Sequence, residues 1–333
     1  MELLKVKNLK TNFFIDAGMV QAVRGVDISL GKGESLGIVG ESGSGKSVTM
    51  LSIMGLLEEN SSVDADELKF NGENLLDKRE DEMRKISGGE IGMIFQDPMS
   101  SLNPLFTVGN QITEAIRLHN KISKKDAEKK ALKMLEMVEI SSPESRMNQY
   151  PHELSGGMRQ RVMIAMAMSC NPKLLIADEP TTALDVTIQA QILDLMKTLK
   201  EKTETSIILI THDLGVIANM CEKIVVMYGG TVVEKGSKED IFYNSKHPYT
   251  WGLLNSIPKC EGKKKDKLVP IPGSPPDLLN PPKGCPFTPR CAHGMKICQE
   301  YIPGLKTLSK THSSACWMLH PSMPKDEKRE GER

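Results

Sequence analysis

The sequence predicts an α/β fold in which a parallel sheet carries a phosphate-binding loop. Three short apolar runs, at residues 35–40, 173–180 and 206–213, have the composition of strands that are buried on both faces. The first run leads directly into the glycine-rich stretch GESGSGKS and then into a helix-like segment at 48–57. A helical pattern at 187–203 separates the other two runs, which makes a strand–helix–strand unit.

Further elements are expected on either side of this unit. Residues 2–9 alternate between apolar and polar side chains and predict an edge strand, and residues 20–30 predict a second strand. Residues 120–140 carry apolar side chains at helical spacing with lysines opposite, which predicts an amphipathic helix. Residues 223–236 have the pattern of a hairpin that closes the core.

Length and composition narrow the class of protein. The chain has 333 residues, enough for two domains or for one large domain with an appendage. Its 43 basic and 43 acidic residues balance, which argues against a strongly basic nucleic-acid binder. No apolar run approaches the roughly 20 residues of a membrane-spanning helix, and the opening MELLKVKNLK lacks the features of a secretory signal. We therefore expect a cytoplasmic location.

The composition changes after about residue 256. Residues 257–291 are dense in proline, glycine and lysine and have little periodicity, which predicts a linker that leads into a small irregular module. The last residues, 322–333, are expected to be disordered.

The stretch from Gly40 to Ser47 fits the motif G-x-x-x-x-G-K-[ST], with the strand and the helix on the correct sides. Its glycines allow successive backbone N–H groups to point at one phosphate, and the helix N-terminus adds a positive dipole end. Lys46 would bridge the β- and γ-phosphates, and the Ser47 hydroxyl would hold Mg²⁺. The residues expected to contact the nucleotide here are Ser42, Gly43, Ser44, Gly45, Lys46, Ser47 and Val48.

Two carboxylates follow the second apolar run. The segment LLIADEP delivers Asp178 and Glu179 at the carboxyl end of a buried strand, where ligands bind in open α/β sheets. Asp178 suits the Mg²⁺ shell, and Glu179 suits the polarisation of an attacking water. An adjacent pair of carboxylates alone is more often a solvated strand end, but the apolar run and the upstream phosphate loop favour the catalytic interpretation.

The segment LSGGMRQR at 154–161 predicts a second anion-binding helix start. The loop that contains Lys46 already occupies the phosphates within one subunit, so the second element is expected to act on the nucleotide of a partner. Two ATP molecules would then lie between two chains. Each site would combine one chain's phosphate loop with the other chain's Ser155, Gly156 and Gly157.

On these motifs the sequence resembles the ATP-binding subunits of ABC transporters, across roughly residues 3–257. The resemblance implies that Gln96 in MIFQDP is the Q-loop glutamine, which touches Mg²⁺ and senses the γ-phosphate. Asp185 in TTALD matches the D-loop. His212 in ILITHD matches the switch histidine, which contacts the γ-phosphate and the attacking water.

The resemblance also implies an aromatic residue that stacks on adenine. Phe13 in TNFF occupies that place, with the adjacent Phe14 as competitor, because stacking requires only a flat π-face. A second Ser-Gly-Gly stretch, at 86–90, lacks the following MRQR and is assigned to a turn.

The fold that the resemblance implies is an α/β P-loop NTPase core of the ABC ATPase type, with a parallel sheet, an antiparallel β subdomain and a helical subdomain. The nucleotide-binding domain would span 1–257, with the helical subdomain at about 97–160. Residues 258–333 would form a small, irregular, metal-bound C-terminal extension with a disordered tail.

Three segments resemble a narrower group, the ATP-binding subunits of dipeptide and oligopeptide importers. Residues 95–116 resemble the stretch that receives a permease coupling helix, and residues 247–258 and 270–291 resemble the C-terminal extension of these subunits. The resemblance implies a second ATPase subunit, two membrane permease subunits and an extracytoplasmic peptide-binding protein, with this chain peripheral on the cytoplasmic face of the membrane.

Other functions are weighed against this one. Nickel and some opine importers share the same C-terminal extension, so they are the alternative cargo classes. An ATPase that acts on DNA or ribosomes is disfavoured, and no nucleic-acid partner is expected. ABC ATPases of those classes carry long coiled-coil insertions or two fused cores, and this sequence has neither.

Four cysteines gather near the C-terminus, at Cys285, Cys291, Cys298 and Cys316. Their spacing contains neither the tight C-x₂₋₄-C knuckle of structural zinc sites nor the bacterial ferredoxin pattern. Four thiolates in a proline-rich module of few hydrophobes favour a soft metal centre over unrelated thiols. Members of the resembled family suggest a [4Fe–4S] cluster on these four cysteines.

Two alternatives to the cluster remain. Zinc is the second choice, and reduced or disulfide-paired cysteines are the third. Three histidines lie near enough in the sequence to replace a cysteine at zinc: His293, His312 and His320. The scattered Cys170, Cys221 and Cys260 are expected to act as buried hydrophobes.

Overall fold

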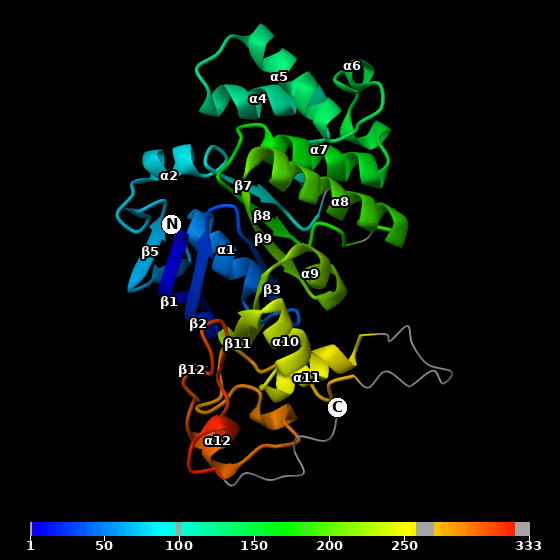
Figure 1. The fold of residues 1–333 in the computed structure, drawn as a ribbon. Coiled ribbons are helices and arrows are strands. Elements are labelled where there is room, and N and C mark those ends of the chain that lie inside the picture. Colours follow the sequence, from blue (N-terminus) through cyan, green and yellow to red (C-terminus); the bar gives the residue numbers. More distant parts are fainter. Residues whose placement is uncertain (1, 98–100, 183, 258–269, 324–333) are drawn as a thin grey trace, which may run out of the picture.

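The structure of the chain is a computed structural model, which describes residues 2–97, 101–182, 184–257 and 270–323. It comprises two sheets, a group of helices at one end and a C-terminal module at the other (Figure 1). Residues 258–269 of the expected linker and residues 324–333 of the expected disordered tail lie outside the described residues. The same holds for the domain boundary placed between residues 257 and 258.

The larger sheet has the strand order β12-β13-β11-β10-β3-β9-β8-β7. Its centre is parallel, as the apolar runs predict, because β10, β3, β9, β8 and β7 pair with one another in the same direction. Every residue of β3, β8 and β9 is buried. The bounds of these strands are β3 (Ser35–Val39), β7 (Ile91–Ile94), β8 (Leu174–Asp178), β9 (Ser206–Thr211), β10 (Lys223–Tyr228) and β11 (Thr231–Ser237).

The second sheet is antiparallel and contains the N-terminus. Its bounds are β1 (Glu2–Ile15), β2 (Gly18–Gly31), β4 (Ser61–Asp64), β5 (Glu67–Phe70) and β6 (Glu73–Asn74). The expectation of an edge strand at residues 2–9 is wrong, since β1 pairs with β2 on one side and with β4 and β5 on the other. Alternation in a sequence identifies a half-buried strand, but it does not say how many neighbours pair with it.

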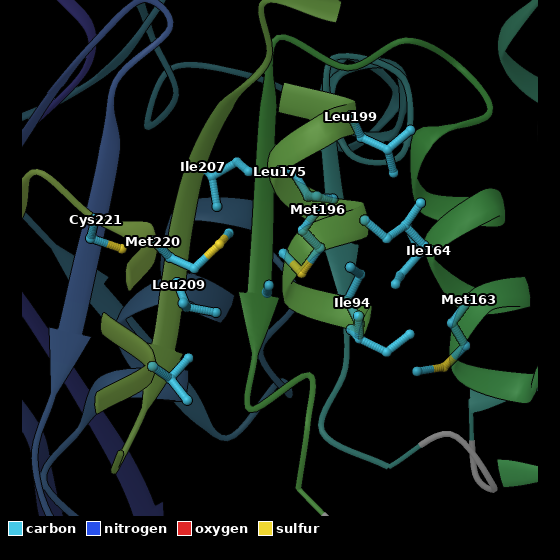
Figure 2. Packing of buried hydrophobic residues seen from close by; sticks show 14 of the residues in the cluster. Ile94, Met163, Ile164, Leu175, Met196, Leu199, Ile207, Leu209, Met220 and Cys221 are labelled. Atoms are coloured by element: carbon cyan, nitrogen blue, oxygen red, sulfur yellow. The ribbon is translucent and has the colours of Figure 1, made fainter. Parts of the chain in front are cut away.

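Helices cover both faces of the larger sheet. On one face, Met163 and Ile164 of α7 and Met196 and Leu199 of α8 pack against sheet residues such as Leu175 (Figure 2). On the other face, α1 and the antiparallel sheet bury a second cluster. The helix bounds are α1 (Lys46–Met54), α2 (Glu80–Ile86), α4 (Val108–His119), α5 (Lys124–Met137), α6 (Pro143–Arg146), α7 (Gly156–Met168), α8 (Val186–Thr203), α9 (Leu214–Met220), α10 (Lys238–Asn244), α11 (Pro248–Asn255) and α12 (Lys296–Glu300).

The helices α4, α5 and α6 lie together at one end of the molecule, beyond α7 (Figure 1). The helix expected at 120–140 is α5, and its buried residues Ala131 and Leu135 lie on the predicted apolar face. The stretch at 86–90 is a turn as expected: α2 ends at Ile86, and Gly88 adopts a positive φ of 87°. None of the described helices combines the length and apolar composition required to cross a bilayer.

The C-terminal module, residues 270–323, lies beside α10 and α11 at the opposite end from α4 and α5 (Figure 1). It is largely irregular, as expected, with the short strands β12 (Lys306–Thr307) and β13 (Ser313–Ser314). Because β13 pairs with β11, the module extends the larger sheet. The buried His312 Nε2 lies 2.8 Å from the buried Glu234 carboxylate on β11, which fixes this junction further.

Candidate functional site

The phosphate-binding loop follows β3 at the carboxyl end of the parallel sheet and leads into α1. Gly45 lies at its end in the left-handed region, with φ 93°, and a Cβ there would lie 2.5 Å from the Ala22 carbonyl oxygen. Only glycine fits this position, since the backbone conformation and the close approach both exclude a side chain. The predicted strand–loop–helix arrangement is present as β3 and α1, although α1 ends at Met54 and not at residue 57.

Lys46 lies inside the curve of the loop and is only 6% exposed. Its Nζ donates to the carbonyl oxygens of Gly40 at 2.7 Å and Glu41 at 2.9 Å. Burial lowers the pKa of Lys46, and the carboxylates of Glu179, Asp178 and Glu41 oppose that shift. A buried ammonium whose partners are mainly backbone carbonyls suits a strongly anionic ligand.

Two buried oxygen atoms in this region have no hydrogen-bond partner among the described residues: Ser44 Oγ and Asp178 Oδ1. Burial raises the pKa of Asp178, and a hydrogen bond with Ser47 opposes the shift. Orphaned buried oxygens are costly unless a ligand satisfies them. The donor set fits a phosphate at Ser44 and a hard cation between Asp178 and Ser47, because Mg²⁺ prefers oxygen ligands.

Glu179 follows Asp178 and is the centre of a cluster of polar side chains. Its carboxylate accepts a hydrogen bond from Gln96 Nε2 at 3.2 Å and from Thr182 Oγ1 at 2.8 Å, and it lies 3.2 Å from His212 Nδ1. Its φ of 46° is a strained conformation for a residue other than glycine.

The electrostatics of this cluster keep the Glu179 carboxylate charged. Burial raises its pKa, but the hydrogen bonds of Thr182 and His212 outweigh burial, so that the pKa lies below its usual value. Three segments that are distant in the sequence thus meet at the Glu179 carboxylate. The motifs around Gln96, Glu179 and His212 require these residues to lie close together. Sequence reasoning did not single out Thr182, although it lies in the quoted TTALD stretch.

The two candidate aromatic residues for adenine lie on β1. Phe13 pairs with Val20 and Ser61 and is half-buried, whereas Phe14 is 54% exposed. Adjacent residues of a strand point to opposite faces, so only one of the two can face the phosphate loop. The assignment of Phe13 stays a prediction.

The Ser-Gly-Gly helix start and the D-loop residue lie together on α7 and α8. Ser155 caps α7 and accepts a hydrogen bond from the Met158 N–H at 3.4 Å, and Asp185 caps α8 through the Ile188 N–H at 3.0 Å. A Cβ on Gly157 would lie 3.0 Å from the Ile188 side chain, so the two helix starts pack closely. Ser155, Gly156 and Asp185 are all exposed.

The four C-terminal cysteines surround one small cavity, which Phe287 and Trp317 also line. Burial raises the pKa of Cys285 and of Cys291, and it raises the pKa of Cys316 to about 12. All described cysteines are unpaired, so the disulfide alternative is not seen. Of the scattered cysteines, Cys221 is buried and Cys170 is half-buried, and Cys260 lies outside the described residues.

No group of three or more His, Cys, Asp or Glu side chains among the described residues is arranged to hold a metal ion. The expectation of a metal-bound C-terminal module is therefore not supported. Zinc binds cysteine sulfur at about 2.3 Å, so the ligands of one zinc ion lie close together. No such close group is found among the described residues. His293 lines the same cavity, but His312 is paired with Glu234 instead.

A separate cavity of about 940 Å³ lies at the other end of the parallel strands. Its lining includes Lys173 and Ser206, at the starts of β8 and β9, and the charged side chains around it have both signs. It lies away from the phosphate loop, because the loop follows the carboxyl end of β3. Size alone therefore does not identify the functional site here.

Comparison with known proteins agrees with this geometry. A family model described as "ABC transporter" matches residues 23–182, and one described as "Oligopeptide/dipeptide transporter, C-terminal region" matches residues 233–298. The chain is 57% identical to the oligopeptide transport ATP-binding protein OppD of Bacillus subtilis over 326 residues, which are 98% of this chain and 91% of that protein. It is 53% identical to the dipeptide transport ATP-binding protein DppD of Lactococcus lactis over 325 residues, 97% of this chain and 93% of that protein.

A solved structure titled "Dimeric Structure of MJ0796, a Bacterial ABC Transporter Cassette" matches with a TM-score of 0.63 and 31% identity, over 71% of this chain and 98% of that one. A phosphate-binding loop at the end of a central parallel strand defines a P-loop NTPase. More narrowly, the chain belongs to the ABC transporter ATP-binding family and is an ABC-type ATPase.

Proposed function

We propose that this chain is the ATP-hydrolysing motor subunit of an importer of dipeptides or oligopeptides. The observation that carries the ATPase part is the meeting of Gln96, Thr182 and His212 at the Glu179 carboxylate. The peptide part is supported by relatives described as oligopeptide and dipeptide transport ATP-binding proteins, which match nearly the whole chain. The match to the C-terminal region of such transporters supports it independently.

Each residue of the site has a role in this proposal. Lys46 and the loop N–H groups bind the phosphates, while Ser47, Gln96 and Asp178 would hold Mg²⁺, whose chemistry is to neutralise phosphate charge. Glu179 accepts a proton from the attacking water because its carboxylate is ionised, and His212 orients that water and the γ-phosphate. Positioning and charge supply most of the catalysis of phosphoryl transfer.

The complete site is proposed to need two ATPase chains. Ser155, Gly156 and Gly157 form the N-terminal end of α7, where Ser155 and Gly156 are exposed and the helix dipole is positive. Asp185 caps the neighbouring α8, so these residues are suited to a nucleotide held by another copy or a related subunit. The solved dimer of a similar cassette supports this arrangement. Two permease subunits and a peptide-binding protein would complete the importer, with this chain peripheral on the cytoplasmic face of the membrane.

Reconstitution tests this function. The chain would be produced together with two permease subunits and a second ATPase subunit and reconstituted in vesicles. ATP turnover and the uptake of a labelled dipeptide or oligopeptide would then be measured. We expect peptide-loaded binding protein to stimulate turnover and uptake to require ATP. Stimulation by Ni²⁺ or an opine, but not by peptide, would contradict the proposed cargo. Stimulation by nucleic acid would contradict transport itself.

We further propose that Cys285, Cys291, Cys298 and Cys316 ligate a [4Fe–4S] cluster. Their common cavity and their position in a module with few buried hydrophobes support this, since Cys thiolates are the usual ligands of such clusters. The cluster would join segments that cannot bury enough surface unaided.

Anaerobic purification tests the cluster. Brown protein with broad visible absorption and equal iron and sulfide contents is the expected result, and Cys298→Ser should lose the colour. Cys170→Ser is the matched control, because Cys170 lies outside the cavity, and it should keep the colour. Colourless protein with one zinc per chain would contradict the cluster.

A further inference from the structure

The C-terminal module reaches back to the phosphate-binding loop through one side chain. Arg290, beside Cys291 in the module, forms a two-pronged ion pair with Glu41, the second residue of the loop. Its Nη2 donates to Glu41 Oε1 at 3.0 Å, and its Nη1 donates to Oε2. The two residues are 249 positions apart in the sequence, so this contact is a product of the fold alone.

The surroundings of Arg290 fix the direction of its guanidinium. The side chain is 5% exposed, and it also donates to the carbonyl oxygens of Pro272 at 2.7 Å and Ile271 at 3.1 Å and to Tyr228 Oη at 3.2 Å. The hydrogen bond with Glu41 raises the pKa of Arg290, against the effect of burial. A planar guanidinium held on several sides gives a geometrically specific contact, unlike a mobile surface pair.

Glu41 is also held from a second element outside the loop. Its backbone N–H donates to Tyr249 Oη of α11 at 2.8 Å. The module supports this contact too, because the Phe287 ring packs against Tyr249 at 5.3 Å and against Tyr228 at 5.2 Å between centroids.

Two further contacts reach the Glu41 carbonyl, from the Ser44 N–H at 3.2 Å and from Lys46 Nζ at 2.9 Å, and the second is expected to change when a nucleotide binds. In this structure Lys46 Nζ donates to the carbonyls of Gly40 and Glu41, but it must turn to the phosphates to perform its role. The contacts that reach Glu41 from outside the loop are then those of Arg290 and Tyr249, beside the Ser44 N–H bond within the loop. A loop that is already held in place binds more tightly than one that must be ordered on binding.

We propose that Arg290 is a positioning residue for nucleotide binding, by which the C-terminal module holds Glu41 and thereby sets the affinity of the phosphate loop for ATP. The proposal rests on the nucleotide role of the loop. By linkage, a nucleotide in the loop stabilises the module to the same extent.

Equilibrium binding of a fluorescent ATP analogue with Mg²⁺ to the full-length chain tests this. We expect Arg290→Ala and Glu41→Ala each to raise the Kd at least about fivefold, the lower end of typical coupling between sites. The double variant should be no weaker than the weaker single variant, since both remove the same contact. Arg290→Lys keeps the charge but loses the two-pronged geometry and should fall between wild type and Arg290→Ala.

Controls separate positioning from a general structural effect. Lys306→Ala, elsewhere in the module, should bind like wild type, because Lys306 contacts the Leu319 carbonyl and not the loop. If Arg290→Ala unfolds the module, as judged by limited proteolysis, then Glu41→Gln in an intact module decides, and it should still raise the Kd.

The proposal is overturned if folded Arg290→Ala or Glu41→Gln binds the analogue like wild type. It is also overturned if the effects of Arg290→Ala and Glu41→Ala simply add in the double variant. Lys46→Ala tests the underlying assignment separately: if that variant binds normally, the nucleotide role of the loop fails, whatever the Arg290 variants show.

Discussion

The ATPase core and the C-terminal module are held together by different means. In the core, β3, β8 and β9 are buried along their whole length and pair through continuous ladders, so that hydrophobic burial and backbone hydrogen bonds act together. In the module, the longest strand has two residues, and attachment depends on individual contacts at Arg290, Phe287 and His312. The core should therefore tolerate single changes that would loosen the module.

The largest effect is expected for a change that alters chemistry in the core and leaves both regions folded. Glu179→Gln removes the ionised carboxylate that Gln96, Thr182 and His212 surround, so ATP turnover should fall by about 100- to 10,000-fold, the usual contribution of a general base. ATP binding should persist. Phosphate release by the assembled ATPase and nucleotide binding are the measurements, with the exposed Glu201→Gln as control. Normal turnover by Glu179→Gln would show that Glu179 is not the base.

Phe287→Ala tests whether individual side chains hold the C-terminal module on the ATPase core. Phe287 is 3% exposed and packs on Tyr228, Tyr249 and His247. Truncation of such a ring costs about 3–5 kcal/mol. Limited proteolysis should show cleavage in the module while the core survives, whereas Tyr301→Ala, in a 60% exposed side chain, should change little. If the module is equally protected from the protease in both variants, Phe287 is not needed to hold the module on the core.

A smaller effect is expected from pH at the same junction. Burial lowers the pKa of His247 to about 3, against about 6.5 when unfolded. Because the unfolded chain binds the extra proton below pH 6.5, stability falls as the pH falls from 6.5 towards 3, and the loss at pH 5 is about 2 kcal/mol.

Substitution isolates the histidine from the other titrating groups. His247 Nδ1 accepts a hydrogen bond from the Tyr249 N–H at the start of α11, and asparagine can replace that acceptor. Urea unfolding at pH 5 and 7 should show that His247→Asn loses about 2 kcal/mol less stability than wild type over this range. An unchanged pH dependence would mean that His247 is protonated in the folded chain.

The smallest effects are expected within the core. Ser155 and Ser123 each cap a helix through a backbone N–H three residues on, so Ser155→Ala and Ser123→Ala should each destabilise the isolated chain by about 1 kcal/mol. Only Ser155→Ala should also lower ATP turnover in the assembled complex, because only Ser155 is assigned to a partner's nucleotide. Equal turnover in the two variants would remove that assignment.

The sequence predicted those features whose cause is local. The glycine and lysine pattern from Gly40 to Ser47 lies in one continuous strand, loop and helix, and the apolar runs around β8 and β9 reveal burial directly. Features that depend on distant partners were not predicted. The neighbours of β1, the pairing of β13 with β11 and the contact of Arg290 with Glu41 leave no local pattern, because the energy that selects them arises only in the folded chain.

The pairing of β13 with β11 has a consequence for shortened versions of the protein. A chain that stopped after α11 would keep the phosphate loop. The Val233 carbonyl would lose the hydrogen bond that the Ala315 N–H now donates to it. The truncation would also remove the His312 ring whose Nε2 now lies 2.8 Å from the Glu234 carboxylate. An edge strand with unpaired backbone groups can pair with a strand of another chain, so such a fragment should self-associate. The C-terminal module is therefore expected to shield the edge of β11 from pairing with other chains.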